Sequence, residues 1–115
     1  MLVKDSLLNF LDAMGQSKAF ARYTMEKDVI ANVKSKPSLR LFFDMLSLFL
    51  KETLSQKRGE RIYLNAYATI LSALSRKLPR LEENIVEVMT MRTEIETNIN
   101  AGLLLTHLVT VLCKE

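Results

Sequence analysis

Apolar residues recur at helical spacing along almost the whole chain, and short polar breaks divide this pattern into segments. The first segment covers residues 4–14, where leucines and a methionine share one face. Gly15 follows it as a candidate C-cap, and Asp5 or Ser6 is expected to cap its start. The segment therefore predicts a short amphipathic helix.

The second segment, residues 17–33, is less apolar and predicts a helix that is only partly buried. Ser17 is the expected N-cap. Lys27 interrupts the apolar stripe, and its long stem is expected to lie over apolar surface while its ammonium group stays in water. The residues expected on the apolar side are Ala19, Phe20, Tyr23, Ile30 and Val33.

The most apolar long segment, residues 39–54, follows the boundary Lys36-Pro37-Ser38. Proline disfavours helical angles at the residue before it, so Lys36 is expected outside the helix and Ser38 is expected as its N-cap. Apolar side chains cover most of the circumference, which predicts a helix at the centre of the fold or one covered by a partner. These side chains are Leu39, Leu41, Phe42, Phe43, Met45, Leu46, Leu48, Phe49, Leu50 and Leu54.

Two more helices are predicted after a polar break that ends in a glycine. The first runs from about residue 60 to residue 78, and Pro79 either ends it or occupies the first turn of the next helix. The second runs from residue 80 to about residue 98. Arg92 falls within its apolar stripe, where it is expected either at the edge of a groove or in contact with a partner.

A terminal helix is predicted over residues 103–112, after the step Asn98-Ile99-Asn100. Either asparagine is expected to end the preceding helix in a left-handed conformation, and Asn100 is also a good cap for the next one. The terminal helix is apolar on more than one face, so we expect it to insert between other helices or to dock on another subunit. The whole chain predicts one all-α domain over residues 1–115, a single compact bundle of five to six helices.

Residue types that commonly carry chemistry are scarce in this sequence. Cys113 is the only cysteine and His107 the only histidine, which excludes an internal disulfide and a zinc site of the usual spacing. The sequence has no glycine-rich phosphate-binding loop. Glu82, Glu83 and Glu87 fall in the first turns of a predicted helix, where carboxylates suit the helix dipole. These observations predict a protein that is not an enzyme and that needs no cofactor or metal.

Charge and hydropathy bear on the partners and on the location of the protein. The formal net charge is +3, with the basic excess in the first half of the chain. Mixed signs there favour a solvated helix surface, and a nucleic-acid-binding patch is the alternative. No apolar run reaches the roughly 18 residues of a membrane span, so we expect no membrane contact. The single cysteine fits a reducing compartment such as the cytoplasm. The residues of the alternative patch are Lys34, Lys36, Arg40, Lys57, Arg58 and Arg61.

Three segments carry a resemblance to a known family. They are Phe49-Leu50-Lys51-Glu52-Thr53-Leu54, Ile70-Leu71-Ser72-Ala73-Leu74, and the run from Met91 and Arg92 through Asn98-Ile99-Asn100 to Leu103, Leu104, Leu105 and Leu108. In these segments and in helix order, the chain resembles the C-terminal collar domain of bacterial DNA polymerase III clamp-loader subunits, most closely the delta-prime subunit. The gamma/tau and delta subunits share this architecture, so the choice among subunits stays open. An ATPase-like domain and a lid normally precede a collar domain, and we therefore expect the chain to be the C-terminal part of a longer protein.

The resemblance implies a collar-like bundle that does no chemistry and that joins clamp-loader subunits for loading the sliding clamp in DNA replication. Its implied partners are the gamma/tau and delta subunits, and DNA is reached only through the complex. Weak self-association of the chain is also expected. A small basic helical module that binds nucleic acid is the alternative function. The expected subunit-interface residues are Arg92, Asn98, Asn100, Leu104, Leu105 and Leu108.

Overall fold

The computed structural model describes residues 2–97 and 100–114, and every regular element within them is a helix. The expected all-α bundle is thereby confirmed. No helix in this described part is long and apolar enough to cross a membrane. The elements are α1 (Leu2–Gln16), α2 (Lys18–Thr24), the π-helical segment η1 (Met25–Val29), α3 (Ile30–Asn32), α4 (Lys36–Lys57), the short helical turn η2 (Asn65–Tyr67), α5 (Ala68–Lys77), α6 (Leu81–Glu94) and α7 (Ala101–Leu112).

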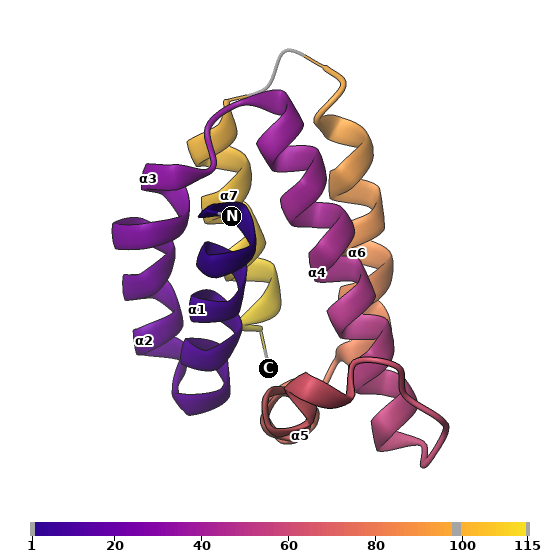
Figure 1. The fold of residues 1–115 in the computed structure, drawn as a ribbon. Coiled ribbons are helices and arrows are strands. Elements are labelled where there is room, and N and C mark those ends of the chain that lie inside the picture. Colours follow the sequence, from indigo (N-terminus) through magenta and orange to yellow (C-terminus); the bar gives the residue numbers. More distant parts are fainter. Residues whose placement is uncertain (1, 98–99, 115) are drawn as a thin grey trace.

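The helices form two edges with a terminal helix between them. Helices α4 and α6 pack side by side along one edge, and α1 packs against α2 and η1 along the other (Figure 1). Helix α5 crosses one end of the bundle, where it contacts both α1 and α4. Helix α7 contacts α6 on one side and η1 and α3 on the other, so it connects the two edges.

Helix α4 supplies the centre of the core, as its apolar circumference predicts. Phe42, Phe43, Leu46 and Leu50 are inaccessible to solvent, and the two phenylalanine rings pack edge to face. Full burial of each such side chain contributes about 1.5–3 kcal/mol to folding. Leu48 differs from these residues, because half of its surface stays exposed.

Helix α1 continues through Gly15, so the expected C-cap at this position is wrong. A Cβ atom at Gly15 would lie 2.8 Å from the Cβ of Ala73 on α5. Glycine fits here because α1 and α5 approach each other too closely for a side chain at that point. The expected N-cap is also wrong: α1 begins at Leu2, and the Ser6 hydroxyl donates instead to the Asp28 carboxylate on η1 at 2.8 Å.

Helix α2 begins as expected, because the Ser17 hydroxyl accepts a hydrogen bond from the backbone N–H of Phe20. The expected apolar side is right at its end, where Val33 is buried and Ile30 packs against the core, but wrong at its start. Ala19, Phe20 and Tyr23 are exposed, whereas Met25 is buried. A π-helical turn holds more residues than an α-helical turn. A stripe drawn at α-helical spacing through residues 17–33 therefore does not stay on one face.

Helix α4 begins before its expected N-cap. Ser35 is the cap: its hydroxyl accepts from the N–H of Ser38, and the Ser38 hydroxyl accepts from the N–H of Ser35. Pro37 lies in the first turn, where its missing N–H has no helical partner to lose. Lys36 is thus the first residue of the helix, and the expectation of Ser38 as the cap is wrong.

Residues 60–64 are not helical, so the helix expected from residue 60 begins later, with α5 at Ala68. The side chain of Glu52 on α4 explains this difference. It is buried, and one carboxylate oxygen accepts from the backbone N–H groups of Tyr63 at 2.6 Å and Leu64 at 2.8 Å. These bonds hold the loop against α4 and occupy N–H groups that a helix would otherwise use.

The last two helices meet partly as expected. Asn100 caps α7 as predicted, by accepting from the N–H of Leu103 at 3.0 Å. The expected left-handed end at Asn100 is wrong, because its φ is −76°, and α6 ends at Glu94, earlier than predicted. Asn98 lies outside the described residues. Helix α7 inserts between other helices, and of its leucine and valine side chains only Leu103 is exposed.

Candidate interaction surfaces

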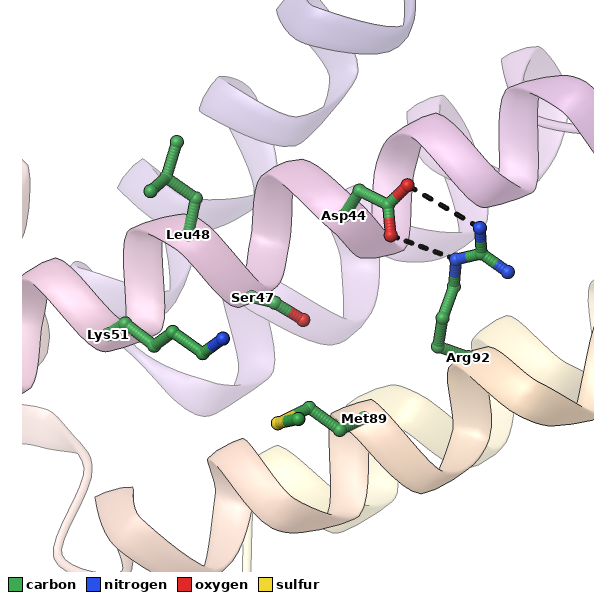
Figure 2. Close-up of a pocket in the computed structure, with 6 residues that line it drawn as sticks. All are labelled: Asp44, Ser47, Leu48, Lys51, Met89 and Arg92. Atoms are coloured by element: carbon green, nitrogen blue, oxygen red, sulfur yellow. Dashed lines mark hydrogen bonds and ion pairs between the residues drawn. The ribbon is translucent and has the colours of Figure 1, made fainter.

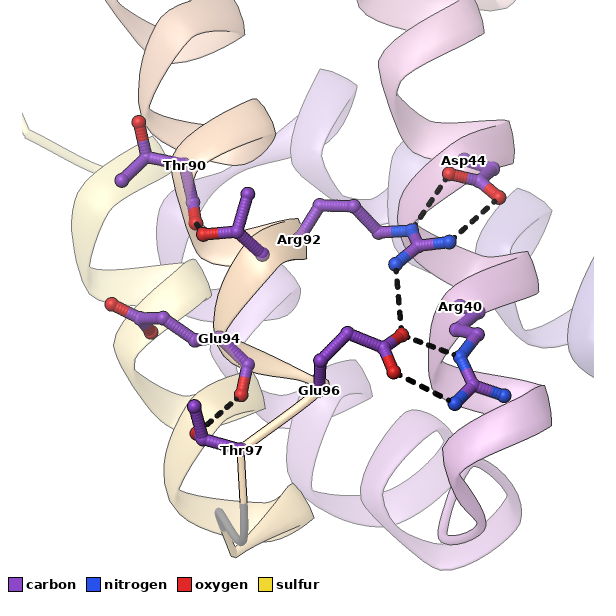
Figure 3. A network of polar contacts seen from close by, with 8 residues as sticks. Arg40, Asp44, Thr90, Arg92, Glu94, Glu96 and Thr97 are labelled. Carbon is purple, nitrogen blue, oxygen red and sulfur yellow. Dashed lines mark hydrogen bonds and ion pairs between the residues drawn. The ribbon is translucent and has the colours of Figure 1, made fainter.

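Arg92 closes an ion-pair network that joins α6 to α4 (Figure 3). Its Nε donates to Asp44 at 2.9 Å, and its Nη1 lies 3.6 Å from the carboxylate of Glu96. Arg40 on α4 binds the same carboxylate through two nitrogens, at 2.7 and 3.0 Å. The guanidinium group of Arg92 is thus occupied within the chain, at the edge of a groove.

The pairing in this network shifts the pKa values of its groups. Hydrogen bonding from Arg40 holds the pKa of Glu96 below its ordinary value, and the same bonds raise the pKa of Arg40. Hydrogen bonding to Asp44 raises the pKa of Arg92. Because these groups are largely solvent-exposed, their pairing adds little to the stability of the fold. It does link the end of α6, and the turn after it, to α4.

A shallow groove of about 320 Å³ lies beside this network, between α4 and α6 (Figure 2). Leu48 and Met89 supply its apolar surface and are each about half exposed. Lys51 points into it, and no ion pair joins this ammonium group to another described residue. This α4/α6 groove is suited to holding a side chain of a partner. Its lining residues are Asp44, Ser47, Leu48, Lys51, Met89 and Arg92.

A second groove of about 210 Å³, the acidic groove, lies between α6 and α7. Glu87 and Glu94 contribute two carboxylates to its lining, and Val86 beside them is 64% exposed. The Glu94 carboxylate forms no ion pair within the part of the chain that the structure describes. Glu87 lies 4.0 Å from a guanidinium nitrogen of Arg80, so the uncompensated negative charge of the acidic groove comes from Glu94, which lies beside the apolar surface. Its lining residues are Val86, Glu87, Thr90, Met91, Glu94, His107 and Val111.

The outer surface of α2 and η1, the α2 face, combines aromatic and basic side chains. Phe20 is 42% exposed and Tyr23 is 58% exposed. Arg22 and Lys27 are exposed on the same segment, and neither forms an ion pair with another described residue. Sequence reasoning missed this surface because it placed both aromatic residues on the apolar side.

The leucines of the expected interface are part of the core. Leu104, Leu105 and Leu108 are each at most 2% exposed. They anchor α7 in the bundle and present no surface to a partner in this fold. Asn100 is exposed, and its side chain is used as the cap of α7. The position of Asn98 is outside the described residues.

The basic residues expected to form one patch lie at the two ends of α4. Lys34, Lys36 and Arg40 are at or near its start, where Arg40 is paired with Glu96. Lys57, Arg58 and Arg61 are at its end. A helix of this length spans about 33 Å at 1.5 Å per residue. The fold therefore divides the expected patch into two smaller groups.

Of the residues with catalytic potential, His107 lines the acidic groove together with Glu87 and Glu94, whereas Cys113 lines a different pocket. Within residues 2–97 and 100–114, no group of three histidine, cysteine, aspartate or glutamate side chains is placed to hold a metal ion. Cys113 is buried, and burial raises the pKa of its thiol, so the sulfur stays protonated at neutral pH. His107 is exposed and lines the acidic groove.

Comparison with known proteins identifies no relative of this chain. No protein-family model, no curated protein and no solved structure matches the chain. The surfaces described above and the sequence resemblance are therefore the grounds on which a function is proposed.

Proposed function

We propose that this chain is a non-catalytic assembly module that joins clamp-loader subunits in the cytoplasm, in the manner of the collar domain of a delta-prime-like subunit. Three sequence segments that resemble this family support the proposal, and so does the all-α fold. The observation that carries it is the exposure of large apolar side chains at both edges of the bundle. They are Phe20 and Tyr23 on the α2 face, and Val86 and Met89 on α6.

Exposed apolar pairs of this kind stabilise a complex when a partner covers them. Burial of apolar surface contributes about 25 cal/mol per Å², and a stable interface buries about 1,200–2,000 Å² in total. Interfaces usually place charged groups around such an apolar centre. Arg22 near one pair and Glu94 near the other fit this arrangement.

The ion-pair network gives the α6 edge a fixed position. Arg92 bridges Asp44 on α4 and Glu96 beyond the end of α6, and Arg40 holds Glu96 from α4. Helix α6 cannot shift along α4 without breaking these bonds. A surface that is already ordered loses less conformational entropy on binding. The network should therefore raise the affinity of a partner for this edge.

A pull-down with purified clamp-loader subunits tests the proposal. We expect the immobilised chain to retain gamma/tau or delta. The double variant Val86→Glu, Met89→Glu should lose this binding by about tenfold or more, since it places charge at the apolar centre of the contact. Tyr63→Glu is the matched control, because Tyr63 is exposed but lies in the loop before α5. Retention of neither subunit by a chain that circular dichroism shows to be folded would refute the proposal.

A second candidate function is a small module that binds nucleic acid. The group of Lys57, Arg58 and Arg61 at one end of α4 favours it. Part of this charge is occupied, because Arg58 lies 3.4 Å from Glu82 and Arg61 lies 5.2 Å from the centre of the Tyr63 ring. Binding of labelled DNA that weakens steeply with salt would support this function. Absence of binding at low salt would exclude it.

A further inference from the structure

We propose that the acidic groove receives the α2 face of a second copy of this chain, so that copies join head to tail. This inference rests on the proposed assembly function and names the two surfaces that meet. Each copy carries both surfaces, and they are built from different helices, so one copy can use both at the same time.

The α2 face offers aromatic side chains next to positive charge. Phe20 and Tyr23 lie three residues apart, which places them on one side of α2. The segment 18–27 contains three basic residues and one acidic residue. Among the basic ones, Arg22 and Lys27 are exposed and have no ion-pair partner among the described residues. This face therefore needs a partner that is apolar at its centre and acidic around it.

The acidic groove has the complementary composition. Three of the four acidic residues of helix α6 are paired, Glu82 with Arg58 and both Glu83 and Glu87 with Arg80, whereas Glu94 has no ion-pair partner among the described residues. The one basic residue of α6, Arg92, is paired with Asp44. The carboxylates of Glu87 and Glu94 line the groove together with apolar atoms of Val86 and other residues. Its volume is about 210 Å³, whereas a cavity of about 150 Å³ holds a benzene ring. The groove thus has room for one aromatic side chain of the α2 face.

The placement of the two surfaces determines the kind of assembly. Helix α2 lies at one edge of the bundle, and α6 lies at the opposite edge (Figure 1). A contact between unlike surfaces is heterologous, so each copy binds one neighbour through its α2 face and another through its acidic groove. Repetition of this contact gives a closed ring or an open filament, according to the rotation between neighbours.

Apolar contact and charge have different effects in this pairing. Burial of the aromatic side chains supplies most of the affinity. Exposed ion pairs add little to stability, but opposite charges align the two surfaces, and like charges disfavour contact between two α2 faces or between two grooves. We expect weak self-association that decreases at high salt.

Two charge-reversal variants test the pairing. Arg22→Glu with Lys27→Glu makes the α2 face acidic, and Thr90→Lys with Glu94→Lys makes the groove basic. None of these four side chains belongs to the buried core, so both variants should fold, as circular dichroism will show. Sedimentation equilibrium at low salt, up to about 1 mM protein, measures the mass of each protein alone and of their equimolar mixture. Tyr23→Ser is a third variant that removes an aromatic ring and changes no charge.

The head-to-tail contact predicts a particular set of results. The unmodified chain should associate, and each charge-reversed variant alone should be monomeric, because its two surfaces then carry the same sign. The mixture should associate again, because the altered α2 face of one variant fits the altered groove of the other, and the unaltered surfaces still match. Tyr23→Ser should weaken association by about tenfold or more. A monomeric unmodified chain, undiminished association of a single variant, or a mixture that stays monomeric would each overturn the inference.

Binding of gamma/tau and delta to the same proteins separates this inference from the proposed function. If the unmodified chain is monomeric and yet binds these subunits, self-pairing is wrong and the assembly function stands. If the chain self-associates in the predicted pattern but binds neither subunit, the pairing is right and the clamp-loader function is wrong.

Discussion

Gly15 is the position where one methyl group should reveal how closely α1 and α5 pack. A Cβ atom there would lie 2.8 Å from the Cβ of Ala73, a distance at which the two carbons overlap. Overpacking of this kind costs about 1–3 kcal/mol, whereas alanine in place of glycine inside a helix gains about 1 kcal/mol. Gly15→Ala should therefore lower the free energy of unfolding by about 0–2 kcal/mol despite its better helix propensity.

The reverse change on α5 should compensate for this loss. Ala73→Gly alone should cost about 2 kcal/mol, from about 1 kcal/mol of helix propensity and about 0.8 kcal/mol for the lost methyl contact. The double variant moves the methyl group from α5 to α1, which removes the overlap and cancels the propensity terms. Its free energy of unfolding should lie within about 0.5 kcal/mol of the unmodified chain.

Urea unfolding followed by circular dichroism measures the two single variants, the double variant and the unmodified chain. Close packing predicts a coupling of about 2–4 kcal/mol between Gly15→Ala and Ala73→Gly. Additive effects of the two substitutions would refute the reasoning, because they would mean that α1 and α5 have room for both methyl groups.

Three other experiments test the roles of Glu52 and Asp28 and the burial of Cys113. Glu52→Ala should lower the free energy of unfolding by about 2–4 kcal/mol, since it leaves two loop N–H groups without their acceptor. Glu52→Gln retains an acceptor oxygen and should lower this free energy by less. Equal losses for the two variants in urea unfolding would contradict this account. Burial raises the pKa of Asp28, but hydrogen bonds from Asn9, Ser6 and Asn32 outweigh it and leave that pKa below its ordinary value. The carboxylate of Asp28 therefore stabilises the fold fully above about pH 4 and loses this effect as the pH falls further. Asp28→Asn should flatten the decrease of the unfolding free energy below about pH 4, and an unchanged slope would show that Asp28 is not responsible. The buried Cys113 thiol, with its raised pKa, should react with iodoacetamide only after unfolding, and rapid labelling of the folded chain would contradict its burial.

Helices could be predicted from the sequence where local spacing and tertiary packing agree. The apolar circumference of residues 39–54 indicated a central helix, and α4 occupies that place. Ser17 indicated the start of α2 because an N-cap acts on N–H groups only a few residues away. Information of this kind is contained within one turn of the chain.

Features that depend on distant partners could not be predicted in this way. Glu52 accepts from N–H groups 11 and 12 residues later, and no local pattern encodes such a bond. Gly15 has the residue type of a cap, but its neighbour in space is Ala73 on another helix. The π-helical turn of η1 rotates the apolar stripe, so Phe20 and Tyr23 were placed on the wrong side.

The candidate surfaces show the same limit. The apolar excess of α7 predicted that its leucines are covered, but not whether helices of the same chain or another subunit cover them. Leu104, Leu105 and Leu108 are covered by the chain itself. The sequence singled out Arg92 because it interrupts an apolar stripe, but its partners Asp44 and Glu96 became evident only when α4 and α6 were placed side by side.

The central claim is that the apolar edges of this bundle bind clamp-loader subunits. Size-exclusion chromatography with light scattering, applied to the chain mixed with purified gamma/tau and delta, tests this claim most directly. We expect the chain to elute with one or both subunits in a complex of defined mass, and the Val86→Glu, Met89→Glu variant to elute separately. Separate elution of the folded, unmodified chain from both subunits would contradict the claim.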